Sequence, residues 1–107
     1  MIITPRNDVA GHRVAEELGL VRGSTIRARH LGRDILAIFK TLVGGEIQEY
    51  TKMMAEAREQ AIDRMTDEAR SLGANAIVGV RFSTSYVMQS TAEILVYGAA
   101  VRVEAEG

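Results

Sequence analysis

The stretch from Ala92 to Val103 is apolar on both of its faces, and no other feature of the sequence constrains the fold as strongly. As an extended strand it would carry two apolar sets, Leu95, Tyr97, Ala99, Val101 and Val103 on one face and Ile94, Val96, Gly98 and Ala100 on the other. A strand of this kind is normally covered on both sides. The rest of the chain must therefore supply two covering layers, or another subunit must supply one of them.

One long helix is predicted as a covering layer. From Glu46 to Leu72, apolar residues recur at steps of three and four, which is the spacing of an amphipathic helix. The apolar stripe consists of Tyr50, Met53, Met54, Ala57, Ala61, Met65, Ala69 and Leu72. Gly73 is well placed as a left-handed cap at the C-terminal end. Because several residues of the stripe are alanines, the helix axis is expected to lie close to a sheet.

The remaining elements are predicted as strands, apart from a short helix over residues 34–43. The strands are expected over residues 2–4, 14–29, 76–82 and 92–103, with a polar turn over 83–91. Gly19 and Gly23 interrupt the second of these, which is therefore either two short strands or one bulged strand. Alternation within the third predicted strand, residues 76–82, puts four side chains on one face, namely Ala76, Val78, Val80 and Phe82. The fold class is α+β, a small antiparallel sheet packed on one long helix (β-α-β-β), with residues 1–107 as a single domain.

A homo-oligomer is the expected state of such a chain. One long helix covers one face of a small sheet, so the other apolar face of the last strand would be an exposed patch in a monomer. A second subunit, in an assembly of closed symmetry, would cover this patch. The alternative is that the short helix over residues 34–43 folds over that face instead.

The composition argues against several classes of function. Lys and Arg total 13 and Asp and Glu total 14, so the net charge of −1 lacks the basic excess of a nucleic-acid or membrane-surface protein. The absence of Cys excludes disulfides, thiolate metal sites and a thiol nucleophile. No apolar run approaches the roughly 20 residues of a membrane-spanning helix, and no export signal is recognisable. We therefore expect a cytoplasmic protein.

An ordered set of short motifs runs through most of the chain. These are Leu18-Gly19-Leu20-Val21-x-Gly23, Arg33-Asp34, Val43-Gly44-Gly45, Tyr50, Ala57-Arg58-x-x-Ala61, Leu72-Gly73-Ala74-Asn75-Ala76 and Gly98-Ala99-Ala100-Val101. Together they resemble the YbjQ-like proteins, small bacterial and archaeal proteins labelled as heavy-metal-binding. The resemblance implies a subunit related to dodecin-like folds, assembled as a ring of five.

Two histidines are the candidate metal ligands. His12 and His30 are the only strong ligands apart from carboxylates, and neither an H-x-x-x-H nor an H-E-x-x-H pair occurs. A divalent metal ion held between subunits is the form of site most compatible with so few ligands. An acidic row on the long helix is interpreted as a solvated face, and it consists of Glu59, Asp63 and Asp67.

A basic cluster is the candidate site for a small ligand. Arg27 and Arg29 share one face of a strand, and Arg33 lies just beyond them. Repeated around a ring, these side chains would focus positive potential on an anion or an acidic partner. Asp34 and Tyr50 complete the set of candidate ligand-binding residues. The alternative for Arg33 is an ion pair with Asp34 between subunits.

Catalysis is not predicted. Neither a G-x-S-x-G sequence nor a phosphate-loop lysine motif occurs. His30 and Asp34 suggest an acid–base pair, but no nucleophile accompanies them. The predicted function is therefore a non-catalytic homo-oligomeric protein that binds a metal ion or a small ligand at subunit interfaces. The alternative is a structural or partner-interaction ring without a small ligand.

Overall fold

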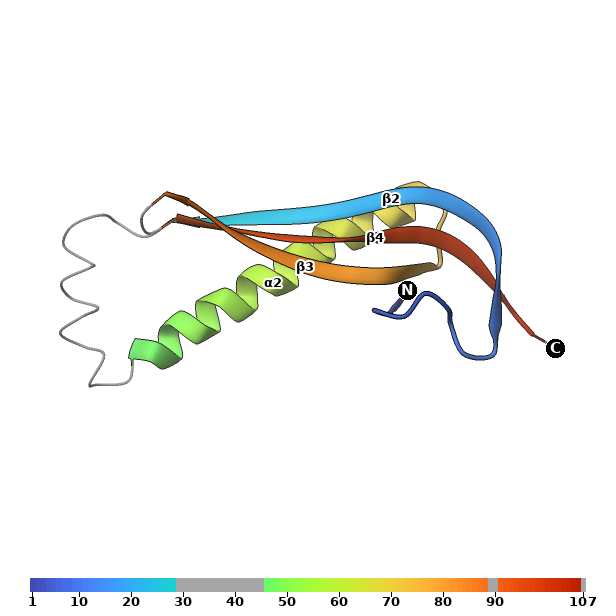
Figure 1. Ribbon diagram of the computed structural model, residues 1–107, viewed down its shortest axis with the longest axis horizontal. Helices are drawn as coiled ribbons and strands as arrows, with labels where there is room; N and C mark the ends of the chain where they lie inside the picture. The colour runs from blue at the N-terminus through green and yellow to red at the C-terminus, as the bar shows by residue number, and fades with distance from the viewer. Residues whose placement is uncertain (29–45, 89–90, 107) are drawn as a thin grey trace.

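The computed structural model describes residues 1–28, 46–88 and 91–106, in which a four-stranded sheet packs against a helix (Figure 1). The elements are β1 (Ile2–Ile3), β2 (His12–Ala28), α2 (Glu46–Ser71), β3 (Ala76–Met88) and β4 (Thr91–Ala105). The strand order is β1-β3-β4-β2, with β4 antiparallel to both neighbours and β1 parallel to β3. The α+β class is confirmed, although the short β1 makes the sheet mixed. The short helix predicted over residues 34–43 lies outside the described residues.

The predicted long helix is confirmed, together with its C-terminal cap. Gly73 has a φ of 85°, and its N–H donates to the Arg70 carbonyl at 2.9 Å. The Ala74 N–H donates to the Ala69 carbonyl at 3.0 Å, which completes a Schellman motif. Four residues of the predicted stripe are fully buried, namely Ala57, Ala61, Met65 and Ala69. The prediction for Leu72 is wrong, because it lies beyond the end of α2 and is 44% exposed. Over the residues described, α2 is not long and apolar enough to cross a membrane.

The helix lies close to β2, as its alanines predict. It packs mainly on β2 and β4 and hardly touches β3. The buried Thr25 hydroxyl donates to the Ala57 carbonyl at 3.0 Å, and the Arg64 guanidinium donates to the Ser24 carbonyl at 2.6 Å. At Gly23 the two backbones are so near that a side chain there would overlap the helix. Small residues on both elements therefore set the distance between the helix and the sheet.

We expect Ala61→Leu to lower the free energy of unfolding by about 1–3 kcal/mol, because a larger side chain must force the helix away from β2. Ala61 is fully buried at the contact, whereas Glu59 is exposed on the same helix. Urea unfolding of Ala61→Leu and of the control Glu59→Leu measures the difference. Equal losses in the two variants would mean that the buried face of the helix is assigned wrongly.

The alternation predicted for the last strand is confirmed in β4. Val96 and Ala100 are fully buried in the cluster beneath α2, and Ile94 is 2% exposed there. On the opposite face Val101 and Val103 are also buried, in a second cluster on which the partly buried Val9 packs. The N-terminal segment of the same chain thus covers one end of the face that the sequence left to another subunit.

β2 is one bulged strand, the second of the two alternatives. Its pairing with β4 shifts register between Val14 and Glu16 and again between Glu17 and Gly19. Gly19 has a φ of 122°, a conformation that other residues rarely adopt. The bulges keep a 17-residue strand continuous along β4 from His12 to Ala28.

Two predictions for β3 are wrong. The polar turn over 83–91 is not seen as such, because β3 continues to Met88 and pairs with β4 through Ser83, Thr84 and Ser85. The face assigned to Ala76, Val78, Val80 and Phe82 is also wrong, because the register shifts between Val78 and Arg81. As a result Ala76 and Val78 join the cluster on the face away from α2, whereas Val80 joins the cluster beneath the helix. Gly79, with a φ of 63°, lies within this bulge.

Candidate functional site

His12 is the predicted metal ligand whose side chain the structure describes. It begins β2, and its Nδ1 lies 2.9 Å from the Ala10 carbonyl oxygen. Because a carbonyl oxygen only accepts hydrogen bonds, Nδ1 is the donor, which leaves Nε2 as the nitrogen that the neutral imidazole can offer to a metal ion. Proteins commonly orient metal-binding imidazoles through such a bond. His12 therefore offers one nitrogen ligand, through Nε2.

The carboxylates near His12 do not complete a site within one chain. Glu104 accepts a hydrogen bond from Arg13 at 2.7 Å, so this nearby carboxylate is already paired. Among the described residues, no group of three or more His, Asp or Glu side chains is arranged to hold a metal ion. The acidic row on α2 is exposed, and Asp67 lies 3.8 Å from Arg70. This is the solvated face that the sequence predicts.

The other candidate residues are placed only in part. His30 and three members of the predicted ligand site lie outside the described residues, and these members are Arg29, Arg33 and Asp34. Arg27 lies in β2 with Ala92 as its partner on β4, and Tyr50 lies in the N-terminal part of α2. The candidate ligand site thus remains a prediction.

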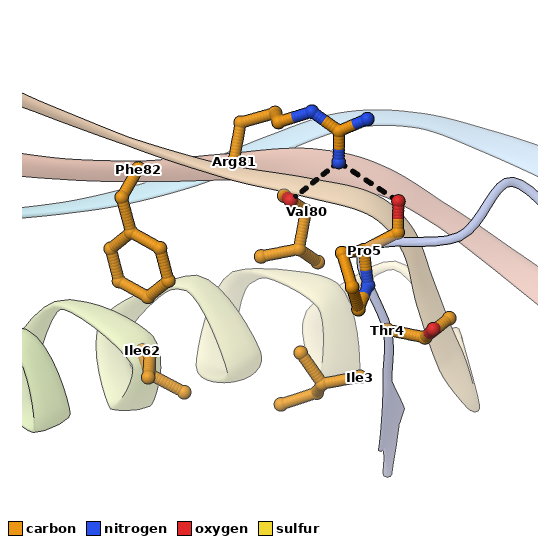
Figure 2. Close-up of a pocket in the computed structure, with 7 residues that line it drawn as sticks. All are labelled: Ile3, Thr4, Pro5, Ile62, Val80, Arg81 and Phe82. Carbon is orange, nitrogen blue, oxygen red and sulfur yellow. Dashed lines mark hydrogen bonds between the residues drawn. The ribbon is translucent and has the colours of Figure 1, made fainter.

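An apolar pocket of about 380 Å³ lies between α2, β3 and the N-terminal segment (Figure 2). Its lining consists of Ile3, Thr4, Pro5, Ile62, Val80, Arg81 and Phe82. Figure 2 shows the Arg81 guanidinium on the side of β3 away from Ile62, so the interior is formed by aliphatic and aromatic groups. Such a surface fits an apolar group and provides no acid, base or metal ligand.

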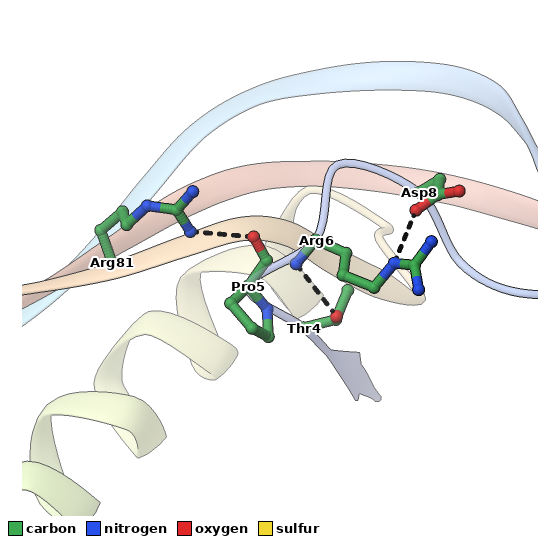
Figure 3. Close-up of polar contacts among 5 residues, drawn as sticks. All are labelled: Thr4, Pro5, Arg6, Asp8 and Arg81. Carbon is green, nitrogen blue, oxygen red and sulfur yellow. Dashed lines mark hydrogen bonds and ion pairs between the residues drawn. The ribbon is translucent and has the colours of Figure 1, made fainter.

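The N-terminal segment that forms one wall of the pocket is held by backbone contacts (Figure 3). Arg81 Nη1 donates to the Pro5 carbonyl at 2.8 Å, and the Arg6 N–H donates to the Thr4 hydroxyl at 3.2 Å. Arg6 also pairs with Asp8 at 3.1 Å, but both side chains are largely exposed, so this ion pair adds little stability. The segment is therefore fixed mainly through its main chain.

This pocket was not predicted from the sequence. The predicted strand over residues 2–4 gave no reason to place Ile3 beside the helix residue Ile62. The third strand was also predicted to end at Phe82, so the exposed continuation of β3 beyond that residue was not expected. The bulge at Gly79, which moves Val80 and Phe82 to the helix side, is the feature that creates the pocket wall. A glycine in the middle of an apolar strand was the available signal for such a bulge.

The chain is similar in sequence to proteins from several bacteria. A UPF0145 protein of Dehalococcoides mccartyi is 60% identical over 104 residues, which cover 97% of this chain and 100% of that protein. A UPF0145 protein of Thermus thermophilus is 58% identical over 104 residues, with coverage of 97% and 91%.

The fold also has a counterpart among solved structures. A protein of unknown function from Pediococcus pentosaceus, of the DUF74 family, superposes with a TM-score of 0.68 at 17% identity, over 97% of this chain and 98% of that one. At that identity the likeness concerns the fold alone. The sequence model of the YbjQ family, which bears the description "Putative heavy-metal-binding", matches residues 1–104. The chain therefore belongs to the YbjQ family.

Proposed function

We propose that the chain is the non-catalytic subunit of a homo-oligomeric ring, most simply of five copies, that binds a metal ion between subunits. Exposed aromatic side chains of β3 carry the oligomeric part of this proposal. Phe82 is 49% exposed and Tyr86 is 77% exposed. Exposed apolar side chains along one strand are typical of a surface that another subunit covers.

A metal site between subunits follows from the number of ligands. Zinc takes four ligands in structural sites, and His12 offers one. Copies of His12, or His12 with His30 and carboxylates of neighbouring subunits, would supply the others. Without thiolates, such a site favours zinc, nickel or copper(II) over mercury or copper(I). The family description supports a metal as the ligand.

Native mass spectrometry and elemental analysis of one sample test both parts of the proposal. We expect a closed oligomer with metal bound in a fixed ratio to subunits. The double variant His12→Ala, His30→Ala should keep the oligomer and lose the metal. Affinity for zinc in titration calorimetry should fall as the pH is lowered, because imidazole binds metals only when it is deprotonated.

The outcomes separate the two parts of the proposal. Weak zinc binding that is unchanged in the double variant would contradict the metal-binding part of the proposal. The ring would then bind an anion or a partner around Arg27, Arg29, Arg33, Asp34 and Tyr50, or serve a structural role. A monodisperse monomer at micromolar concentration would contradict the oligomeric part of the proposal.

A further inference from the structure

The outer edge of β3 changes character at Arg81. Before it, the N-terminal segment occupies this edge, with Thr4 N–H bonded to the Ile77 carbonyl at 3.0 Å and Val80 N–H to the Thr4 carbonyl at 3.1 Å. From Arg81 to Met88, no strand of the described residues pairs with this edge. The unpaired N–H and C=O groups of an edge strand are a template for pairing with another chain. β3 thus presents an open edge directly beside the apolar pocket.

The helix side of this part of β3 is also uncovered. Phe82 and Tyr86 are directly opposite the buried Val96 and Ala92 of β4, so they lie on the sheet face that α2 covers. Yet Phe82 is 49% exposed and Tyr86 is 77% exposed, because α2 lies over β2 and β4 and not over β3. Phe82 lines the pocket (Figure 2), and Tyr86 continues the aromatic strip along the open strand edge.

The opposite edge of the sheet is the structural complement of this strip. β2 is the other edge strand, and α2 packs against it. If the β2 edge of a second copy paired with the open edge of β3, the sheet would continue from one copy into the next. The helix of the second copy would then lie over Phe82 and Tyr86, as α2 already lies over its own β2. One contact would satisfy the open edge and cover the aromatic strip.

We propose that β3 from Arg81 to Met88, with Phe82 and Tyr86, is the surface that receives the β2 edge and helix of the next copy. This inference rests on the homo-oligomer of the proposed function and identifies its interface. The contact is head-to-tail, so each copy offers one β3 surface and one β2 surface, and repetition closes a ring when the rotation allows it.

The variant Tyr86→Glu tests this surface. Tyr86 is mostly exposed in the single chain, so the change should leave each subunit folded, as measured by far-UV circular dichroism. In the assembly the new charge would be buried without a partner, and we expect the subunit dissociation constant to rise about 100-fold or more. The control is Tyr97→Glu, a residue of the central strand β4 that is 37% exposed on the other sheet face. Sedimentation velocity should show a dissociated Tyr86→Glu protein and an intact Tyr97→Glu oligomer.

Three outcomes would overturn the proposal in distinguishable ways. A wild-type oligomer that persists in Tyr86→Glu but dissociates in Tyr97→Glu leaves the ring in place and moves its interface to the opposite face. A wild-type assembly of two subunits indicates a symmetric contact and excludes the head-to-tail one. A monomeric wild type overturns the ring of the proposed function together with its interface.

Hydrogen exchange of the wild-type oligomer provides a measurement that needs no variant. In a free edge strand, alternate amides point to solvent and exchange rapidly. Pairing with the next copy would protect these outward amides between Arg81 and Met88 as strongly as those bonded to β4. Rapid exchange of the outward amides in the intact oligomer would exclude edge pairing at β3.

Discussion

Replacing Gly23 by alanine is expected to lower the free energy of unfolding by about 3 kcal/mol or more, the upper range for overpacking a core. A Cβ at this position would overlap the Ala61 carbonyl oxygen and lie 2.5 Å from the Met65 backbone nitrogen. Both are main-chain atoms of α2, so no side-chain rotation can relieve the contact. The helix must move away from β2, which lengthens the buried hydrogen bond from Thr25 to the Ala57 carbonyl.

Urea unfolding followed by circular dichroism measures this loss. Arg22→Ala is the matched control, because Arg22 is the preceding residue of β2 and its side chain is exposed. We expect the control to stay within about 0.5 kcal/mol of the wild type. Similar unfolding midpoints for Gly23→Ala and the wild type would show that the helix does not lie as close to β2 as the structure has it.

Val96→Asp is expected to abolish folding of the subunit at neutral pH. Val96 is fully buried in the centre of β4, beneath α2 and among apolar neighbours. A carboxylate there would be charged, desolvated and unpaired, at a cost of several kcal/mol, which is most of the stability of a small domain. Burial raises the pKa of such an introduced carboxyl group, so the destabilisation should shrink as the pH falls and the group becomes neutral.

The behaviour of Val96→Asp shows whether Val96 lies in the core of the subunit or in an interface between subunits. A change inside the core unfolds the chain, whereas a change at an interface gives folded monomers. Circular dichroism combined with sedimentation distinguishes these results. Tyr97→Asp is the control, because the adjacent Tyr97 is 37% exposed on the other face. Folded Val96→Asp monomers would place Val96 in an interface, as its apolar strand alone had suggested.

Local periodicity was sufficient to predict two elements of the fold. The stripe of α2 and the alternation of β4 repeat over many residues, so single exceptions do not obscure them. The helix cap at Gly73 also follows from local geometry. By contrast, the bulge in β3 depends on a distant partner, since the Gly79 N–H donates to the Arg6 carbonyl at 2.7 Å. A contact across more than 70 residues leaves no periodic signal.

The same reasoning applies to the candidate site. The sequence contains two histidines and no cysteine, but it could not show that Nδ1 of His12 is bonded to the Ala10 carbonyl. The covering of Val101 and Val103 by the N-terminal segment was not predicted, because Val9, its contact to the second cluster, directly follows the polar residues Arg6, Asn7 and Asp8. Residue type alone did not identify which part of β4 the chain itself covers.

The strand order has a consequence for biosynthesis. β4 is made after β2, α2 and β3, yet it lies between β3 and β2 and pairs with both. Until it emerges from the ribosome, β2 has no strand partner, and the N-terminal segment has no Val101 or Val103 on which to pack. The sheet therefore cannot form progressively as the chain is translated. A nonsense mutation before residue 91 would remove the central strand and leave a product without a sheet core, open to aggregation and proteolysis.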